Sequence, residues 1–98
     1  MHSQPIPADQ PGDRSMAQRQ DDAIEFAVVA HLARLHPVQL TVAEAIRELA
    51  DGSIPGADPI GVQDAIRSLT RAGLLRPHGA CIVPTRATLR LVQLWSVS

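Results

Sequence analysis

The stretch from Asp58 to Thr85, DPIGVQDAIRSLTRAGLLRPHGACIVPT, governs the predicted architecture because it combines one helix, a sharp stop and a β-hairpin. Between about residues 60 and 72, apolar side chains recur at intervals of three and four residues, which places them on one helical face. That face should pack, while the other meets solvent or a ligand. The apolar face comprises Val62, Ala65, Ile66 and Leu69, and the polar face comprises Gln63, Asp64, Arg67, Ser68 and Arg71.

Gly73 is expected to end this helix, because glycine enters the left-handed backbone conformation without a steric penalty from a Cβ atom. An extended segment then begins at residues 74–75. Residues 77–79, Pro-His-Gly, have the composition of a turn, and residues 80–83 predict a second strand. Pro84 would end that strand, since proline has no N–H to donate to a neighbouring strand.

The N-terminal region divides into a tail and a first helix. Residues 1–20 contain prolines and scattered polar residues without an apolar period, so we predict a disordered tail there and a domain over residues 21–98. Asp21-Asp22 would cap a helix over residues 23–35, which Pro37 stops. Two apolar stripes on this helix favour deep burial or contact with a second subunit. The stripes are Ile24, Val28, Leu32 and Leu35 on one side and Phe26, Val29, Ala30 and Ala33 on the other.

The middle of the chain predicts a second helix. Residues 38–40 alternate between apolar and polar side chains, which predicts a very short strand. Thr41 and Glu44 predict a capping box at the start of the helix that follows. Residues 51–59 are rich in glycine and proline and predict a long loop before the helix at residues 60–72. The buried face of this second helix would comprise Val42, Ala45, Ile46 and Leu49.

A last helix is predicted over residues 86–95, with Thr85 as its cap. Its apolar residues again form two stripes, more than one small core can hide. The expected fold is therefore mainly α with a small β-hairpin, an α+β arrangement. The stripes are Leu89, Val92 and Trp95 on one side and Leu91 and Leu94 on the other.

Composition excludes several classes of function. The single cysteine, Cys81, rules out an internal disulfide and is expected to be buried. The four histidines show no metal-ligand spacing, and no glycine-rich phosphate loop or HExxH motif is present, so we predict no enzyme, no metal and no cofactor. We interpret His31 as a structural histidine. No signal peptide or span of about 20 apolar residues occurs, so we expect a soluble, cytoplasmic protein.

Charge is distributed unevenly along the chain, although the net charge is only −1. Residues 1–64 carry four arginines and ten acids, giving −6, whereas residues 65–98 carry five arginines and no acid, giving +5. An anionic partner would therefore approach the C-terminal third. The only aromatic residues are Phe26 and Trp95, which disfavours stacking against single-stranded nucleic acid.

The segment AIRSLTRAGLLRPHGACIVPTRATLRLVQLW, residues 65–95, resembles the winged helix-turn-helix DNA-binding proteins, in the broad manner of MarR-like and PadR-like bacterial regulators. The similarity lies in a helix that ends in an L-x-x-x-G-L-L step, a hairpin wing, and a threonine-capped helix. It implies a recognition helix and a wing that contact DNA. By this resemblance Gln63, Arg67, Ser68 and Arg71 fall on the recognition helix, and Arg76 and His78 fall on the wing.

Two hypotheses from different classes follow. The first is a double-stranded DNA-binding protein, a dimeric bacterial transcriptional regulator that inserts the helix near residues 60–72 into the major groove. The second is a winged-helix module whose apolar helices dock a protein partner without binding DNA. The doubled stripes of the first and last helices predict a homodimer through those helices under the first hypothesis.

Overall fold

The computed structural model describes residues 15–52, 54 and 56–96. Four helices and three strands occur in this part of the chain, so the architecture is α+β, as the sequence predicted. In chain order they are α1 (Met16–Leu35), β1 (Leu40–Thr41), α2 (Val42–Leu49), α3 (Pro59–Arg71), β2 (Leu75–His78), β3 (Cys81–Pro84) and α4 (Arg86–Ser96).

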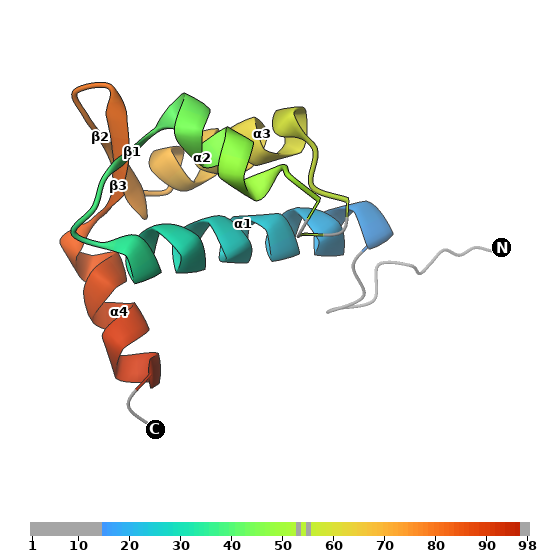
Figure 1. Ribbon diagram of the computed structural model, residues 1–98. Helices are drawn as coiled ribbons and strands as arrows, with labels where there is room; N and C mark the ends of the chain where they lie inside the picture. The colour runs from blue at the N-terminus through green and yellow to red at the C-terminus, as the bar shows by residue number, and fades with distance from the viewer. Residues whose placement is uncertain (1–14, 53, 55, 97–98) are drawn as a thin grey trace, which may run out of the picture.

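The long helix α1 lies across α2 and α3, with the sheet at one end of this layer (Figure 1). From the sheet, α4 leaves the body of the domain and points away from α2 and α3. A single buried cluster joins α1, α2, α3 and the sheet, because each helix turns one apolar face inward. Its most completely buried members are Val28 from α1, Val62 from α3 and Leu75 from β2.

The sheet has three antiparallel strands in the order β1-β3-β2, with β3 in the centre. The predicted first strand at residues 38–40 was placed slightly too early, because the pairing with β3 joins Leu40 to Ile82 and Thr41 to Cys81. The predicted turn was also misplaced, since Pro77 and His78 belong to β2 and the chain reverses at residues 79–80. A proline is tolerated in β2 because this strand lies at the edge of the sheet.

The first helix begins earlier than predicted. Ser15, rather than Asp21-Asp22, is the N-cap of α1, and its side chain accepts a hydrogen bond from the backbone N–H of Gln18 at 3.1 Å. Residues 16–20 are therefore helical and do not belong to a tail; residues 1–14 of the predicted tail lie outside the described residues. The first turns of α1 carry exposed side chains, so no apolar period marks them in the sequence.

The local signals around α3 specify its ends. Asp58 is the N-cap, and its carboxylate accepts a hydrogen bond from the N–H of Gly61 at 2.7 Å. Pro59 occupies the first turn, where its missing N–H has no helical partner to lose. Gly73 has a φ of +87°, the left-handed conformation that the sequence predicted for the residue after the helix. The predicted buried face of α3 is confirmed: Val62, Ala65, Ile66 and Leu69 are all buried.

Two threonines fasten the start of α4 to the start of β2. The hydroxyl of Thr88, which is buried, donates to the carbonyl of Leu74 at 2.8 Å. The hydroxyl of Thr85 donates to the carbonyl of Gly73 at 3.2 Å, and the carbonyl of Thr85 accepts from the N–H of Leu89. The first turn of α4 is therefore held rigidly beside the hairpin, although the rest of α4 extends away from the domain.

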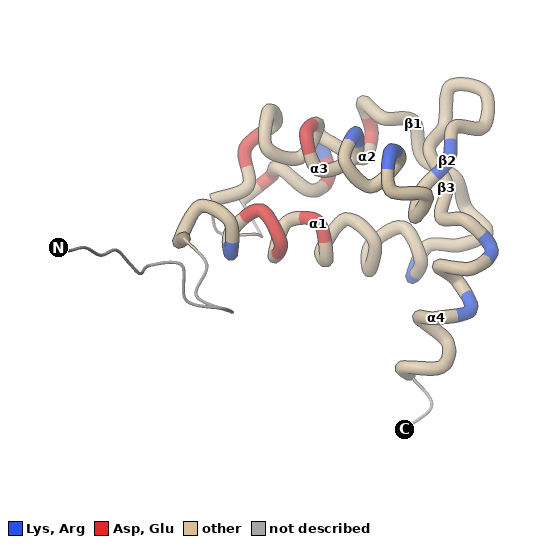
Figure 2. The backbone as a smooth tube through the Cα atoms, turned by 180° about the vertical axis from the view of Figure 1, so that it is seen from behind, with Lys and Arg blue, Asp and Glu red and all other residues tan. Residues whose placement is uncertain are grey.

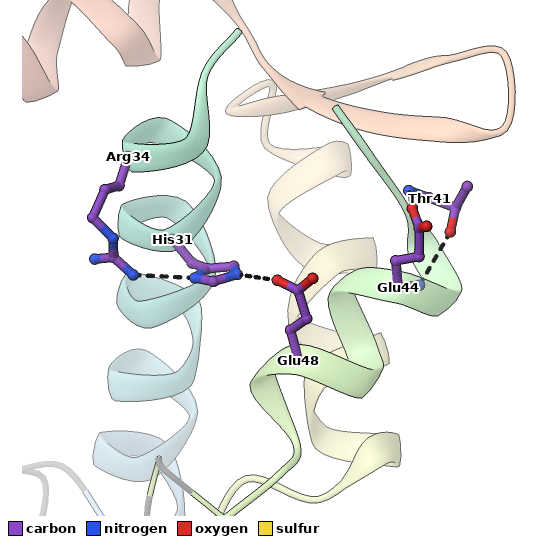
Figure 3. A network of polar contacts seen from close by, with 5 residues as sticks. All are labelled: His31, Arg34, Thr41, Glu44 and Glu48. Atoms are coloured by element: carbon purple, nitrogen blue, oxygen red, sulfur yellow. Dashed lines mark hydrogen bonds and ion pairs between the residues drawn. The ribbon is translucent and has the colours of Figure 1, made fainter. Parts of the chain in front are cut away.

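The predicted capping box at the start of α2 is confirmed. The N–H of Glu44 donates to the hydroxyl of Thr41 at 3.1 Å, and the N–H of Thr41 donates to the carboxylate of Glu44 at 2.8 Å (Figure 3). We expect Thr41→Ala to lower the free energy of unfolding by about 1 kcal/mol, because it leaves the N–H of Glu44 without its acceptor. Urea denaturation measures this loss, and Thr41→Ser should retain most of the stability.

Glu44 makes the stability that the capping box contributes depend on pH. The backbone N–H and the hydroxyl of Thr41 hold the pKa of Glu44 below its ordinary value. The contribution of the ionised carboxylate should therefore be complete above the ordinary glutamate pKa, and lost as pH falls through the lower pKa of the folded state. Glu44→Gln removes this titration, so denaturation curves of the two proteins should differ near neutral pH and converge in acid. A difference that stays constant with pH would contradict this account.

Candidate nucleic-acid interface

The polar face of α3 is fully on the surface. Gln63, Asp64, Arg67, Ser68 and Arg71 are all exposed, because the opposite face of the helix packs on α1 and α2. The four predicted recognition-helix residues are therefore available to a partner. The buried face fixes the rotation of the helix, and with it the direction in which these side chains leave the surface.

On this face, the two arginines and Ser68 line different hollows. Arg67 and Arg71 line a hollow of about 440 Å³ between α3 and the hairpin, which we call the hairpin hollow. Pro77 and Ile82, which pair across the hairpin, line its other side. Cys81, at the edge of the hollow, is half-buried rather than fully buried as predicted. Ser68 instead lines a smaller hollow that is shared with acidic residues of α1. Of the predicted α3 residues, the structure thus brings Arg67 and Arg71 together beside the hairpin.

Arg67 also contacts an acid on its own helix. Its guanidinium lies 3.2 Å from the carboxylate of Asp64, three residues earlier, and both side chains are more than half exposed. An exposed pair of this kind contributes about 0–1 kcal/mol, so a stronger anion can displace the carboxylate. Asp64 therefore orients the guanidinium of Arg67 but leaves it able to bind another anion.

The predicted hairpin residues face the other way. Alternate side chains of a strand point to opposite faces, and Leu75 and Pro77 point toward the core and the hairpin hollow. Arg76 and His78 therefore lie on the opposite face of the sheet from Arg67 and Arg71. The imidazole Nδ1 of His78 lies 3.0 Å from the side-chain oxygen of Gln39. The six predicted site residues consequently do not form one continuous surface.

Arg76 belongs to a second cluster that the sequence did not assign. It lines a cleft of about 590 Å³ between the sheet, the chain that follows α1, and the start of α4. We call this the arginine cleft. The run of residues 65–98 without any acid was the signal that could have revealed it. Its polar lining comprises His36, Gln39, Arg76, Arg86, Arg90 and Gln93.

One part of the molecule carries positive charge without acids. Figure 2 shows arginines and no acids along β2 and α4, whereas acids lie on the N-terminal half of α1, on α2, on the loop before α3 and on the first half of α3. The C-terminal half of α3 also carries arginine and no acid. The sheet end of the domain therefore presents the positive surface that the charge distribution of the sequence predicted.

His31 has a structural environment, in agreement with the sequence interpretation. Its Nε2 lies 2.7 Å from the carboxylate of Glu48 on α2, and its Nδ1 lies 3.1 Å from the guanidinium of Arg34 (Figure 3). Arginine can only donate, so Nδ1 accepts and Nε2 carries the proton that is donated to Glu48. This contact ties α1 to α2 and lies outside both the hairpin hollow and the arginine cleft.

Comparison with known proteins gives no relative: no family model, no curated protein and no solved structure matches the chain. Among the described residues, no helix has both the length and the apolar character that a membrane crossing requires.

Proposed function

We propose that this protein is a winged helix-turn-helix regulator of transcription that binds double-stranded DNA through α3, with the β2–β3 hairpin as its wing. The observation that carries the proposal is the pair Arg67 and Arg71, exposed one turn apart on a helix whose opposite face is buried. The 13 residues of α3 give a rod about 20 Å long, which can enter a major groove about 12 Å wide.

The chemistry of the exposed face suits this role. Arginine binds guanine edges and phosphate with two parallel N–H groups, and Gln63 and Ser68 can accept or donate at base edges. Asp64 lies among these groups and would repel phosphate. It would therefore weaken non-specific binding to the DNA backbone and favour sites at which Arg67 contacts a base. Arg76 and His78 would reach the backbone or the minor groove from the far side of the wing.

A salt series on a mixed-sequence duplex tests DNA binding directly. Each phosphate that an arginine neutralises releases counterions, so about four such contacts should weaken binding about 100-fold between 50 and 200 mM salt. Fluorescence anisotropy of a labelled duplex measures this dependence. If affinity is absent at low salt, or does not respond to salt, the DNA-binding proposal is wrong.

The alternative function, docking of a protein partner without DNA, is favoured by one specific surface. Phe26 on α1 is 63% exposed, and Leu91, Leu94 and Trp95 on α4 are 54%, 60% and 71% exposed. Phe26, Leu91 and Trp95 line a groove of about 730 Å³ between α1 and α4, and Leu94 lines a neighbouring hollow between the same two helices. Apolar docking depends little on ionic strength, so the salt series also separates the two functions.

We assign this groove to a second copy of the chain, which makes the regulator a homodimer. The side of α1 that lines these hollows carries Glu25, which is half-buried, toward its N-terminus and the exposed Arg34 toward its C-terminus. An antiparallel, two-fold arrangement of two α1 helices would place the acidic end of each beside the basic end of the other. It would also cover the apolar side chains of both α4 helices.

The dimer predicts a mass of two chains in light scattering at micromolar concentration. Leu91→Glu should give a monomer, because it places a charge in the apolar groove. Ile60→Glu is the matched control, since Ile60 is also an exposed apolar residue but lies on α3 away from the groove, and this variant should remain dimeric. Trp95, the only tryptophan, should show a blue shift of its fluorescence on association. A wild-type monomer, with and without DNA, would contradict the homodimer.

A further inference from the structure

The arginine cleft gathers positive charge from separate parts of the chain. Arg76 comes from β2, Arg86 and Arg90 come from the first turns of α4, and His36 follows α1. Arg86 and Arg90 are four residues apart and therefore lie on the same side of the helix. Folding therefore places Arg76 with Arg86 and Arg90 in the lining of one cleft of about 590 Å³.

Among the described residues, no acid neutralises the charge in this cleft. None of those that line it has an acidic side chain. Within residues 15–52, 54 and 56–96, no ion pair joins a carboxylate to any of its three arginines, in contrast to Arg67, which contacts Asp64. Three like charges around one cleft repel one another, and an anion between them would relieve that repulsion.

The backbone that carries these arginines is held in place. Leu75, which precedes Arg76, is buried, and Thr85 and Thr88 fasten the first turn of α4 to the carbonyls of Gly73 and Leu74. The N-terminal end of α4 adds the positive end of a helix dipole at the same place. An anion would therefore meet donors whose attachment points are already positioned.

We propose that the arginine cleft is a binding site for a phosphate oxyanion. Guanidinium groups suit this ligand because each offers two parallel N–H donors to the oxygens of a phosphate. The volume lies within the range of small-ligand sites. The phosphate belongs either to a DNA backbone or to a free phosphorylated small molecule. For a DNA backbone the proposal rests on the proposed function, which already gives Arg76 a role there, and extends the contact to Arg86 and Arg90; for a free phosphate ester it goes beyond that function.

Titration with inorganic pyrophosphate tests the site without DNA. Isothermal calorimetry and the melting temperature should both report binding to the full chain, and the double variant R86Q/R90Q should weaken it at least tenfold. Arg76→Gln repeats the test from β2, and Arg47→Gln on α2, outside the cleft, is the control that should bind like wild type. Melting curves without pyrophosphate confirm that each variant folds.

A 20-base-pair duplex distinguishes the two sources of phosphate. If the cleft holds DNA backbone, R86Q/R90Q should lower the salt slope of duplex binding by about two units, and pyrophosphate should compete with the duplex. If it holds a free phosphate ester, pyrophosphate binds while the duplex slope is unchanged. Equal pyrophosphate binding by wild type and R86Q/R90Q overturns the proposal. So does the absence of pyrophosphate binding together with an unchanged duplex slope. The pyrophosphate titration does not use DNA, so its result does not depend on whether α3 binds DNA. The two proposals can therefore be contradicted independently.

Discussion

Replacing Leu75 with alanine is expected to lower the free energy of unfolding by about 3 kcal/mol. Leu75 is 1% exposed and lies in the cluster that joins the helices to the sheet. Its removal leaves a cavity that the neighbouring side chains fill only in part. A domain of this size has a total stability of about 5–15 kcal/mol, so the variant should unfold at much lower urea concentration.

Ile60→Ala provides the matched control for this stability experiment. Ile60 is 69% exposed near the start of α3, and its truncation should change the free energy of unfolding by less than about 0.5 kcal/mol. Both variants remove apolar carbon atoms, so the difference between their unfolding free energies reports the effect of burying the side chain. Similar losses in the two variants would show that the cluster around Leu75 is not the core of the protein.

The sequence predicted the helices well where local signals were strong. The helix at residues 60–72 was found at Pro59–Arg71, because its apolar period, Asp58 and Gly73 each act over only a few residues. The capping box of α2 was also predicted, since its two partners are three residues apart. The excess of apolar surface on the last helix was recognised as well, and Leu91, Leu94 and Trp95 are indeed exposed.

The errors occur where a distant partner or an absent pattern determines the structure. β1 is two residues long, and its position depends on β3, about 40 residues later in the chain. Residues 16–20 extend α1 with exposed side chains, so the sequence shows no apolar period there. The grouping of Arg76 with Arg86 and Arg90 requires knowledge of how the hairpin faces α4, which no local spacing provides.

The largest functional effects are expected from the arginines of α3. Arg67→Ala should weaken binding to the preferred duplex by about 1–3 kcal/mol and have little effect on a scrambled duplex, if this side chain reads a guanine. Arg71 is near the C-terminus of α3, and we expect it to contact phosphate. Arg71→Ala should therefore weaken binding to both duplexes alike and lower the salt slope by about one unit.

Asp64 makes the roles of the two arginines separable. Its carboxylate contacts Arg67 and no other arginine of the described residues, so Asp64→Asn should release Arg67 and remove a charge that repels phosphate. We expect this variant to bind the scrambled duplex more tightly and to discriminate less between the two sequences. Anisotropy titrations of the three variants against both duplexes measure these effects, with Arg47→Ala as a control for loss of one positive charge elsewhere. If all three variants match the control on both duplexes, the polar face of α3 does not bind DNA. The exposed apolar surface of α1 and α4 would then be the stronger guide to function.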